Sequence, residues 1–207
     1  IPGSYTLVND INSSGTCIEI QTDNVSIDGQ GYTINYSQSA QGNGIFSDGY
    51  SNVTIRNVTV VQGSSTGFSG GIALQNGEYG SVIDSIITVT SNFANAVRIY
   101  NNQHSLLQGN TIASTATYSY HALLISGSPD TNVSYNSINQ TYGDDVSVVQ
   151  VYISDRARLW NNSVYSDTLD GFYYSLTEDT WSVNNTVWTL QGSSFIFRPG
   201  NSADYNH

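Results

Sequence analysis

The sequence contains no lysine and no methionine, and it has one cysteine and three prolines in 207 residues. A lone cysteine, Cys17, excludes an intrachain disulfide. Five arginines stand against 16 Asp and Glu residues, a net charge of −11, which argues against the basic surface that a nucleic-acid partner needs. No run of about 18 apolar residues occurs, so the sequence predicts no transmembrane segment.

A pair of mostly apolar residues, two positions apart, recurs along the chain and marks a repeating unit, here called a rung. Its first members lie 23–27 residues apart and are Ile18, Ile45, Ile72, Val97, Leu123, Val149, Phe172 and Phe195. The residue before each pair is small, apart from Val148, as expected for a crowded inward position. Spacing within a rung is two rather than 3.6, so the pattern predicts stacked β-strands and little or no helix.

Asparagine recurs later in the rungs, just before a further apolar position. The phrases NTI, NSI, NSV and NTV place Asn110, Asn136, Asn162 and Asn185 at corresponding points. Asparagine tolerates left-handed backbone geometry and bonds the neighbouring backbone. Stacked on one another, these side chains are expected to form a hydrogen-bonded ladder from rung to rung.

The phrases NVSIDGQGYTI (residues 24–34) and NVTIRNVTV (residues 52–60), with the later asparagine corners, resemble right-handed parallel β-helix repeats. That family includes pectate lyases, polygalacturonases and NosD-type periplasmic proteins. The opening PGSYTLVNDINSSGTCIEI is most similar to archaeal cell-surface members of the S-layer and sheath type. The resemblance implies an all-β fold, a single right-handed parallel β-helix of about 7–8 rungs. Residues 1–16 are expected to form a leader strand or partial rung, residues 17–197 the β-helix, and residues 198–207 a tail.

Nine Asn-x-Ser/Thr sequons indicate an exported protein that carries covalent N-glycans, because such sites are glycosylated on exposed surfaces of secreted proteins. They lie at Asn12, Asn24, Asn35, Asn52, Asn57, Asn132, Asn139, Asn161 and Asn184. The expected location is therefore extracellular, at the cell surface or secreted.

Acidic residues recur six or seven positions after several rung starts and offer candidate catalytic groups. Asp130, Asp155 and Glu178 would form an acid/base set if neighbouring carboxylates stack at strand spacing. Asp155, Glu178 and Asp179 are weak candidates for calcium, the one cofactor that the sequence suggests. The simpler interpretation is a solvated turn without catalytic or metal-binding residues.

Aromatic residues gather in the last rungs, at Trp160, Tyr173, Tyr174, Trp181 and Trp188. Flat aromatic faces suit sugar rings, so these residues are candidates for a sugar-stacking platform. The alternative is that they fill a widening core or a subunit contact.

The favoured hypothesis is a structural subunit of an extracellular sheath, surface layer or filament, without enzymatic activity. A terminal rung exposes unpaired strand edges, and the segments beyond the first and last rungs are short, so the expected partner is a second copy stacked end to end. The alternative is a carbohydrate-active enzyme, a polysaccharide lyase or glycoside hydrolase that uses Asp130, Asp155 and Glu178. A glycan-binding adhesin is the third possibility.

Overall fold

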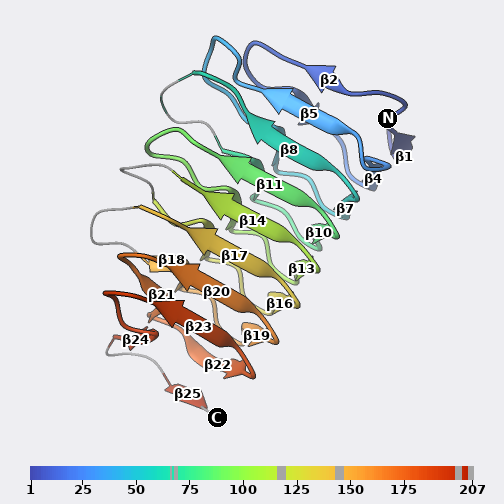
Figure 1. Ribbon diagram of the computed structural model, residues 1–207. Coiled ribbons are helices and arrows are strands. Elements are labelled where there is room, and N and C mark those ends of the chain that lie inside the picture. The colour runs from blue at the N-terminus through green and yellow to red at the C-terminus, as the bar shows by residue number, and fades with distance from the viewer. Residues whose placement is uncertain (66, 68–69, 116–119, 143–146, 199–201, 205–207) are drawn as a thin grey trace.

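The computed structural model describes residues 1–65, 67, 70–115, 120–142, 147–198 and 202–204. Its strands wind into an all-β parallel solenoid of about 7 turns with three parallel sheets, A, B and C. Within the described residues there is no helix, and so none that is long and apolar enough to cross a membrane. Figure 1 shows sheet B facing the viewer, with its strands in chain order from the N-terminal to the C-terminal end.

Sheet A has nine parallel strands, one from each successive rung. They are β1 (Gly3–Thr6), β4 (Val25–Asp28), β7 (Val53–Arg56), β10 (Ser81–Ile83), β13 (Leu106–Gln108), β16 (Asn132–Ser134), β19 (Arg158–Trp160), β22 (Glu178–Val183) and β25 (Ser202–Asp204). The expected leader contributes the first of these strands, and the segment after the last predicted pair contributes β25.

Sheets B and C have eight parallel strands each. Sheet B contains β2 (Ile11–Asn12), β5 (Thr33–Tyr36), β8 (Thr59–Gln62), β11 (Ile86–Val89), β14 (Thr111–Ser114), β17 (Ser137–Gln140), β20 (Ser163–Ser166) and β23 (Thr186–Thr189). Sheet C contains β3 (Ile18–Ile20), β6 (Ile45–Asp48), β9 (Ile72–Gln75), β12 (Val97–Tyr100), β15 (Leu123–Ser126), β18 (Ser147–Tyr152), β21 (Asp170–Ser175) and β24 (Phe195–Phe197).

The predicted apolar pairs are the inward residues of sheet C, and their register is confirmed. Ile18 pairs with Ile45, Ile45 with Ile72, and the column continues to Phe172 and Phe195. Side chains alternate across a strand, so each rung sends two residues of this sheet into the core. The inward residues of all three sheets form one continuous apolar core along the solenoid.

The small residue before each pair is confirmed as a crowded inward position. A side chain on Gly71 would place its Cβ 2.4 Å from Cγ2 of Ile87 in sheet B, and one on Gly171 would lie 2.3 Å from Cγ1 of Val187. At this corner the backbone of the chain entering sheet C therefore lies against side chains of sheet B. Cys17 heads the same column as a half-buried free thiol, whose pKa is raised by burial.

The predicted asparagine ladder is confirmed between sheets A and B. Nδ2 of Asn136 donates to Oδ1 of Asn162 at 2.9 Å, and the backbone N–H of Asn136 donates to the same oxygen at 3.0 Å. Asn110 bonds Asn136 in the same way, and Asn162 bonds Asn185. These buried amides satisfy backbone groups that face the interior at each corner, which would otherwise destabilise the stack.

Candidate functional site: a groove over sheet C

The outer face of sheet C carries a groove of about 430 Å³. Its floor consists of Ala73 and Gln75 of β9 and Arg98 of β12. Ala73 and Arg98 are register partners on neighbouring strands, and both lie between inward residues. Because Ala73 has a small side chain, it leaves a depression in this face beside the arginine.

The entry edge of sheet C supplies polar groups to the groove. Asn43, Gly70 and Asn95 occupy equivalent positions in three successive rungs, immediately before the small-residue column. Oδ1 of Asn43 accepts a hydrogen bond from the backbone N–H of Gly70 at 3.1 Å, and Nδ2 of Asn95 donates to the carbonyl of His121 at 2.8 Å. These bonds fix the polar edge to the solenoid.

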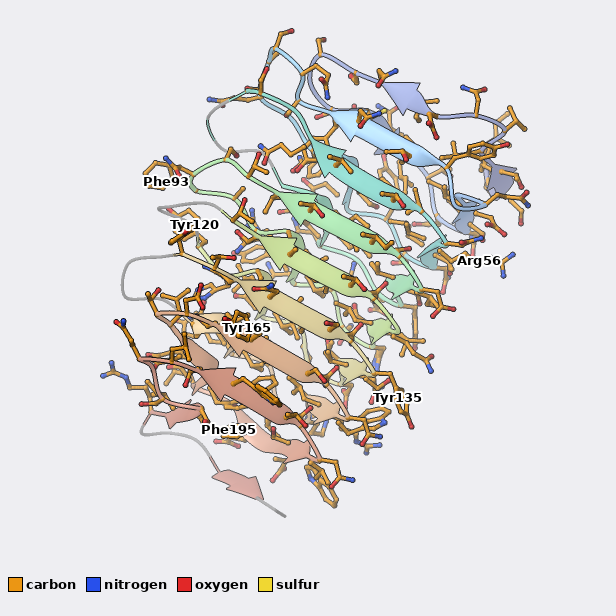
Figure 2. The ribbon with its side chains drawn as sticks, in the orientation of Figure 1. Arg56, Phe93, Tyr120, Tyr135, Tyr165 and Phe195 are labelled. Atoms are coloured by element: carbon orange, nitrogen blue, oxygen red, sulfur yellow. The ribbon has the colours of Figure 1, made fainter. Side chains whose placement is uncertain are left out.

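Two aromatic rings form the outer wall of the groove. Phe93 and Tyr120 come from the segments that connect sheet B to sheet C in successive rungs, and their ring centroids lie 6.2 Å apart with the planes tilted by 59°. Each residue is 46% exposed (Figure 2). Phe93 has a φ of 64°, a left-handed conformation that is costly for a bulky side chain and that recurs at many corners of this solenoid.

Buried glutamines of sheet B hold the two segments that carry these rings. Oε1 of Gln62 accepts the backbone N–H of Ser91 at 2.9 Å, two residues before Phe93. Gln140 donates from Nε2 to the carbonyl of Tyr120 at 2.9 Å and accepts the N–H of Ala122 at 2.7 Å. These hydrogen bonds therefore fix the backbone segments that carry Phe93 and Tyr120.

Arg98 carries a charge that no carboxylate neutralises among the described residues. Its Cζ lies 4.7 Å from the ring centroid of Tyr100, a cation–π contact. Its Nε is buried and has no hydrogen-bond partner in the described structure. A buried charged donor without an acceptor is costly. Because Nε itself is out of reach of solvent, a ligand in the groove can meet only the exposed part of the Arg98 side chain.

The described groove lining is formed by amides, aromatic rings and one arginine, and Tyr120 supplies its one phenol. None of the described residues that line it is Asp, Glu, His or Lys. His121 lies at the edge but is buried, and its Nδ1 donates to the carbonyl of Ser147 at 2.7 Å. Burial lowers the pKa of His121, which keeps the ring neutral and in a structural role.

The candidate acids lie elsewhere, at the corner between sheets C and A, and they are out of register by one residue. The backbone N–H of Asp130 bonds the carbonyl of Asp155, so the residue that stacks on Asp130 is Arg156. Arg156 donates to both oxygens of Asp130, at 2.8 and 2.6 Å. This hydrogen-bonded guanidinium lowers the pKa of Asp130, which opposes the raised pKa that a general acid requires.

Asp155 and Glu178 do occupy corresponding positions in neighbouring rungs. Oδ1 of Asp155 accepts the backbone N–H of Glu178 at 2.8 Å, so this carboxylate caps the corner. Across the described residues, no three His, Cys, Asp or Glu side chains are grouped as a metal ion would need. Calcium at Asp155, Glu178 and Asp179 stays a prediction.

The aromatic residues of the last rungs do not form one platform, because they point from different faces of the solenoid. Tyr174 is buried in the core, and Tyr173 lies on the outside of sheet C. Trp188 projects from β23 in sheet B. Trp160 and Trp181 alone share a hollow, on sheet A.

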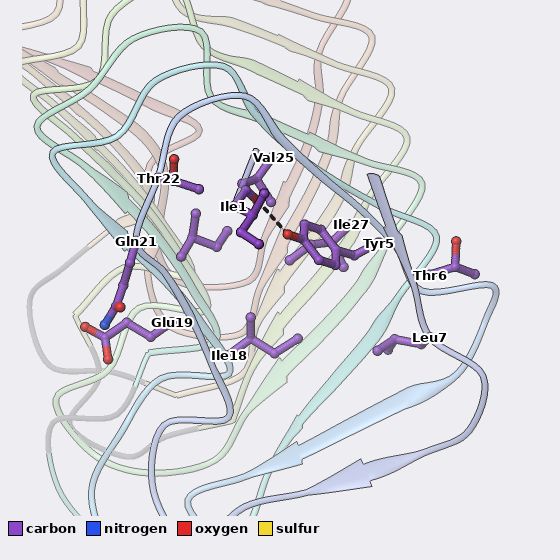
Figure 3. A pocket seen from close by; sticks show the side chains of 11 residues that line it. Ile1, Tyr5, Thr6, Leu7, Ile18, Glu19, Gln21, Thr22, Val25 and Ile27 are labelled. Atoms are coloured by element: carbon purple, nitrogen blue, oxygen red, sulfur yellow. Dashed lines mark hydrogen bonds between the residues drawn. The ribbon is translucent and has the colours of Figure 1, made fainter. Parts of the chain in front are cut away.

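The N-terminal end of the solenoid has an apolar hollow of about 370 Å³ (Figure 3). Ile18 and Ile20 of sheet C and Val25 and Ile27 of sheet A contribute to its lining. The phenol of Tyr5 donates to the carbonyl of Ile1 across it. End-to-end stacking of copies stays a prediction that would use this surface.

The sequon asparagines all lie on surface that is at least partly exposed. Five of them have positive φ values of 51–59° at the corners of the rungs: Asn24, Asn52, Asn57, Asn161 and Asn184. The left-handed corner is by itself a reason for asparagine there, so glycosylation stays a prediction.

No family model matches the chain, and no curated protein matches it either. Among solved structures, the enzymatically active domain of tailspike protein 2 from bacteriophage CBA120 is similar over 98% of this chain, with 11% identity and a TM-score of 0.59. This chain spans 38% of the length of that tailspike chain. The likeness shows the parallel β-helix fold and assigns no family.

Two bacterial structures show weaker likeness. The A-module of mannuronan C-5 epimerase from Azotobacter vinelandii has 10% identity and a TM-score of 0.41, with 97% of this chain and 80% of that chain covered. An alginate lyase from Paenibacillus has 12% identity and a TM-score of 0.41, with 93% and 88% covered. The predicted relation to archaeal surface proteins stays a prediction.

Proposed function

We propose that this chain is an extracellular glycan-binding protein that holds an acidic polysaccharide in the groove over sheet C. The observation that carries the proposal is Arg98, a partly exposed arginine without a described ion pair on the floor of a groove without described acidic groups. A guanidinium pairs with a carboxylate through two parallel hydrogen bonds, which a neutral sugar does not offer.

The other lining groups fit the remainder of a sugar residue. Phe93 and Tyr120 offer aromatic surface to the apolar face of a pyranose ring, and the amides of Asn43 and Gln75 are suited to its hydroxyl groups. The net charge of −11 repels a polyanion at long range, but at physiological salt this repulsion is screened beyond about 8 Å. Salt weakens the attraction between Arg98 and a carboxylate in direct contact with it much less.

Binding without cleavage is the proposed activity, because proton transfer needs a group within hydrogen-bond reach of the substrate. Asp130, Asp155 and Glu178 lie at the corner between sheets C and A rather than on the described groove lining. A lyase or hydrolase reaction at those three residues is the competing hypothesis, and it predicts new reducing or unsaturated sugar ends.

The test is titration calorimetry of the purified chain with hexagalacturonate and hexamannuronate at about 0.15 M salt, followed by chromatography of the sugars. We expect saturable binding of at least one hexamer and its recovery intact. Absence of binding for both hexamers would overturn the proposal. Shortened or unsaturated products would favour the enzymatic hypothesis.

The structural-subunit hypothesis is a second candidate, supported by the apolar hollow at the N-terminal end. It predicts that the chain forms filaments as its concentration rises, which sedimentation and negative-stain electron microscopy detect. Ile18→Asp, in that hollow, would then abolish filaments and leave binding of hexagalacturonate unchanged. A chain that stays monomeric at high concentration would exclude this candidate.

A further inference from the structure

The outer face of sheet A presents two tryptophans on neighbouring strands near the C-terminal end. Arg158 of β19 pairs in register with Trp181 of β22, and Trp160 pairs with Val183. Trp160 and Trp181 therefore stand on one diagonal of a four-residue patch, one strand apart and two residues apart along the strands. Strand spacing of about 4.8 Å and a rise of about 3.3 Å per residue separate their Cα atoms by roughly 8 Å.

This arrangement leaves a hollow of about 330 Å³ between the side chains, within the size range of small-molecule sites. Trp181 is 49% exposed, so much of its ring is available to a ligand. Asn161 and Asn184 stand at the rim, one rung apart, at corners with φ values of 54° and 52°. Their amides can donate to and accept from hydroxyl groups.

Arg158 lies near the acidic corner between sheets C and A, where both oxygens of Asp130 are bonded by Arg156. Asp130 lies close enough for Arg158 to contribute to the lowering of its pKa. The hollow thus differs from the sheet C groove, where the guanidinium faces no described acid. A neutral sugar fits a surface with two aromatic faces, two amides and one guanidinium near an acidic corner.

We propose that this hollow is a second saccharide site, which binds a neutral pyranose. One apolar face of the sugar ring packs on Trp181 and Trp160, and its hydroxyl groups bond the guanidinium of Arg158. The amides of Asn161 and Asn184 add further bonds when these two sequons carry no covalent glycan. The site lies on a different sheet from the acidic-glycan groove and does not depend on it.

The test is titration of the full chain, made in a host without N-glycosylation, with cellohexaose, maltohexaose and chitohexaose. We expect at least one of these neutral hexasaccharides to bind and to change the tryptophan fluorescence. Trp181→Ala should weaken that binding by about 10-fold or more, and Trp181→Phe should retain most of it. Trp188→Ala is the matched control, because Trp188 is 66% exposed on sheet B and lies outside the hollow.

The outcomes separate this site from the proposed groove. We expect Trp181→Ala to leave hexagalacturonate binding unchanged and Arg98→Ala to leave neutral-sugar binding unchanged. Failure of all three neutral sugars to bind, or equal losses in the Trp181 and Trp188 variants, would overturn the proposal. So would sedimentation that shows a dimer lost in Trp181→Ala, because a second copy would then be the occupant.

Discussion

Arg98 and Arg156 lie on the surface of the same solenoid, but their surroundings differ. Arg156, at the corner between sheets C and A, donates two hydrogen bonds to Asp130. Arg98, on the floor of the sheet C groove, packs over Tyr100 and has a buried Nε without a described partner. Within the described structure, the arginine at the corner has an acidic partner and the arginine in the groove has none.

The difference shows how a repetitive fold can separate structural from functional positions. At the corner, stacking brings an acid and a base of adjacent rungs together, and each satisfies the other. In the groove, the register partners of the arginine are Ala73 and Leu124, so neither neighbouring rung supplies a countercharge, and Ala73 leaves space beside it. Three substitutions test this contrast. One fills the space at Ala73, one removes the ring of Tyr120 from the aromatic wall, and one removes the acid Asp130 at the corner.

The largest effect on ligand binding is expected when the space at Ala73, beside Arg98, is filled. Ala73→Phe places a phenyl group on the groove floor without removing any polar contact, and should weaken hexagalacturonate binding by roughly 100-fold or more. Calorimetry measures the loss, and circular dichroism with thermal unfolding checks the fold. Binding that is unchanged in a folded variant would place the ligand elsewhere on the surface.

A smaller effect is expected from the aromatic wall. Tyr120→Ala removes one ring and leaves the backbone bonds from Gln140 in place, so binding should fall by roughly 3- to 10-fold, about 0.7–1.4 kcal/mol. The exposed Tyr135, on sheet A's side of the molecule, provides the control, because Tyr135→Ala should have no effect (Figure 2). Equal losses in the two variants would argue against a specific wall.

The smallest effect is expected at the corner between sheets C and A. There the substitution of Asp130 changes the stability of the fold and leaves ligand binding unchanged. The pKa of Asp130 is lower in the folded chain than the unfolded value of about 3.9, because Arg156 favours the carboxylate. Its stabilisation is therefore present above that unfolded value and is lost as pH falls through the folded pKa. Asp130→Asn should lower the unfolding temperature slightly at pH 7 and by less at pH 2, with binding unchanged at pH 7. A greater loss at pH 2 would contradict the assigned pairing.

The solenoid could be predicted from the sequence because each rung repeats the same physical requirement. Ile45, Ile72 and Val97 must fill the same core position, and the residue before each must leave room for sheet B. Asn110 and Asn136 recur for an equally local reason, since each satisfies buried backbone groups at a corner. Repetition makes such positions visible without a structure.

The groove could not be predicted because it depends on what does not repeat. Phe93 and Tyr120 lie in connecting segments without a common pattern, and their anchors Gln62 and Gln140 look like ordinary polar residues in a strand. The sequence contains one indirect sign of the groove. Ala73 is a small outward residue in register with Arg98, and it becomes informative once the rungs are aligned.

The stacking of Asp130 could not be predicted for the opposite reason. Positions six and seven after a rung start look like one column in the sequence, which groups Asp130 with Asp155. A shift of one residue at a corner changes both the direction of the side chain and its stacking partner. Asp130 consequently meets Arg156 rather than another carboxylate.

The most direct test of the proposed binding function compares Arg98→Ala with Arg156→Ala in parallel titrations with hexagalacturonate. Loss of a charge-assisted hydrogen bond of about 1.5–3 kcal/mol predicts roughly 10- to 150-fold weaker binding for Arg98→Ala. Arg156→Ala should bind like the unaltered chain, because its partner is Asp130. Equal affinities for the two variants, or a loss confined to Arg156→Ala, would contradict the assignment of the ligand to the sheet C groove.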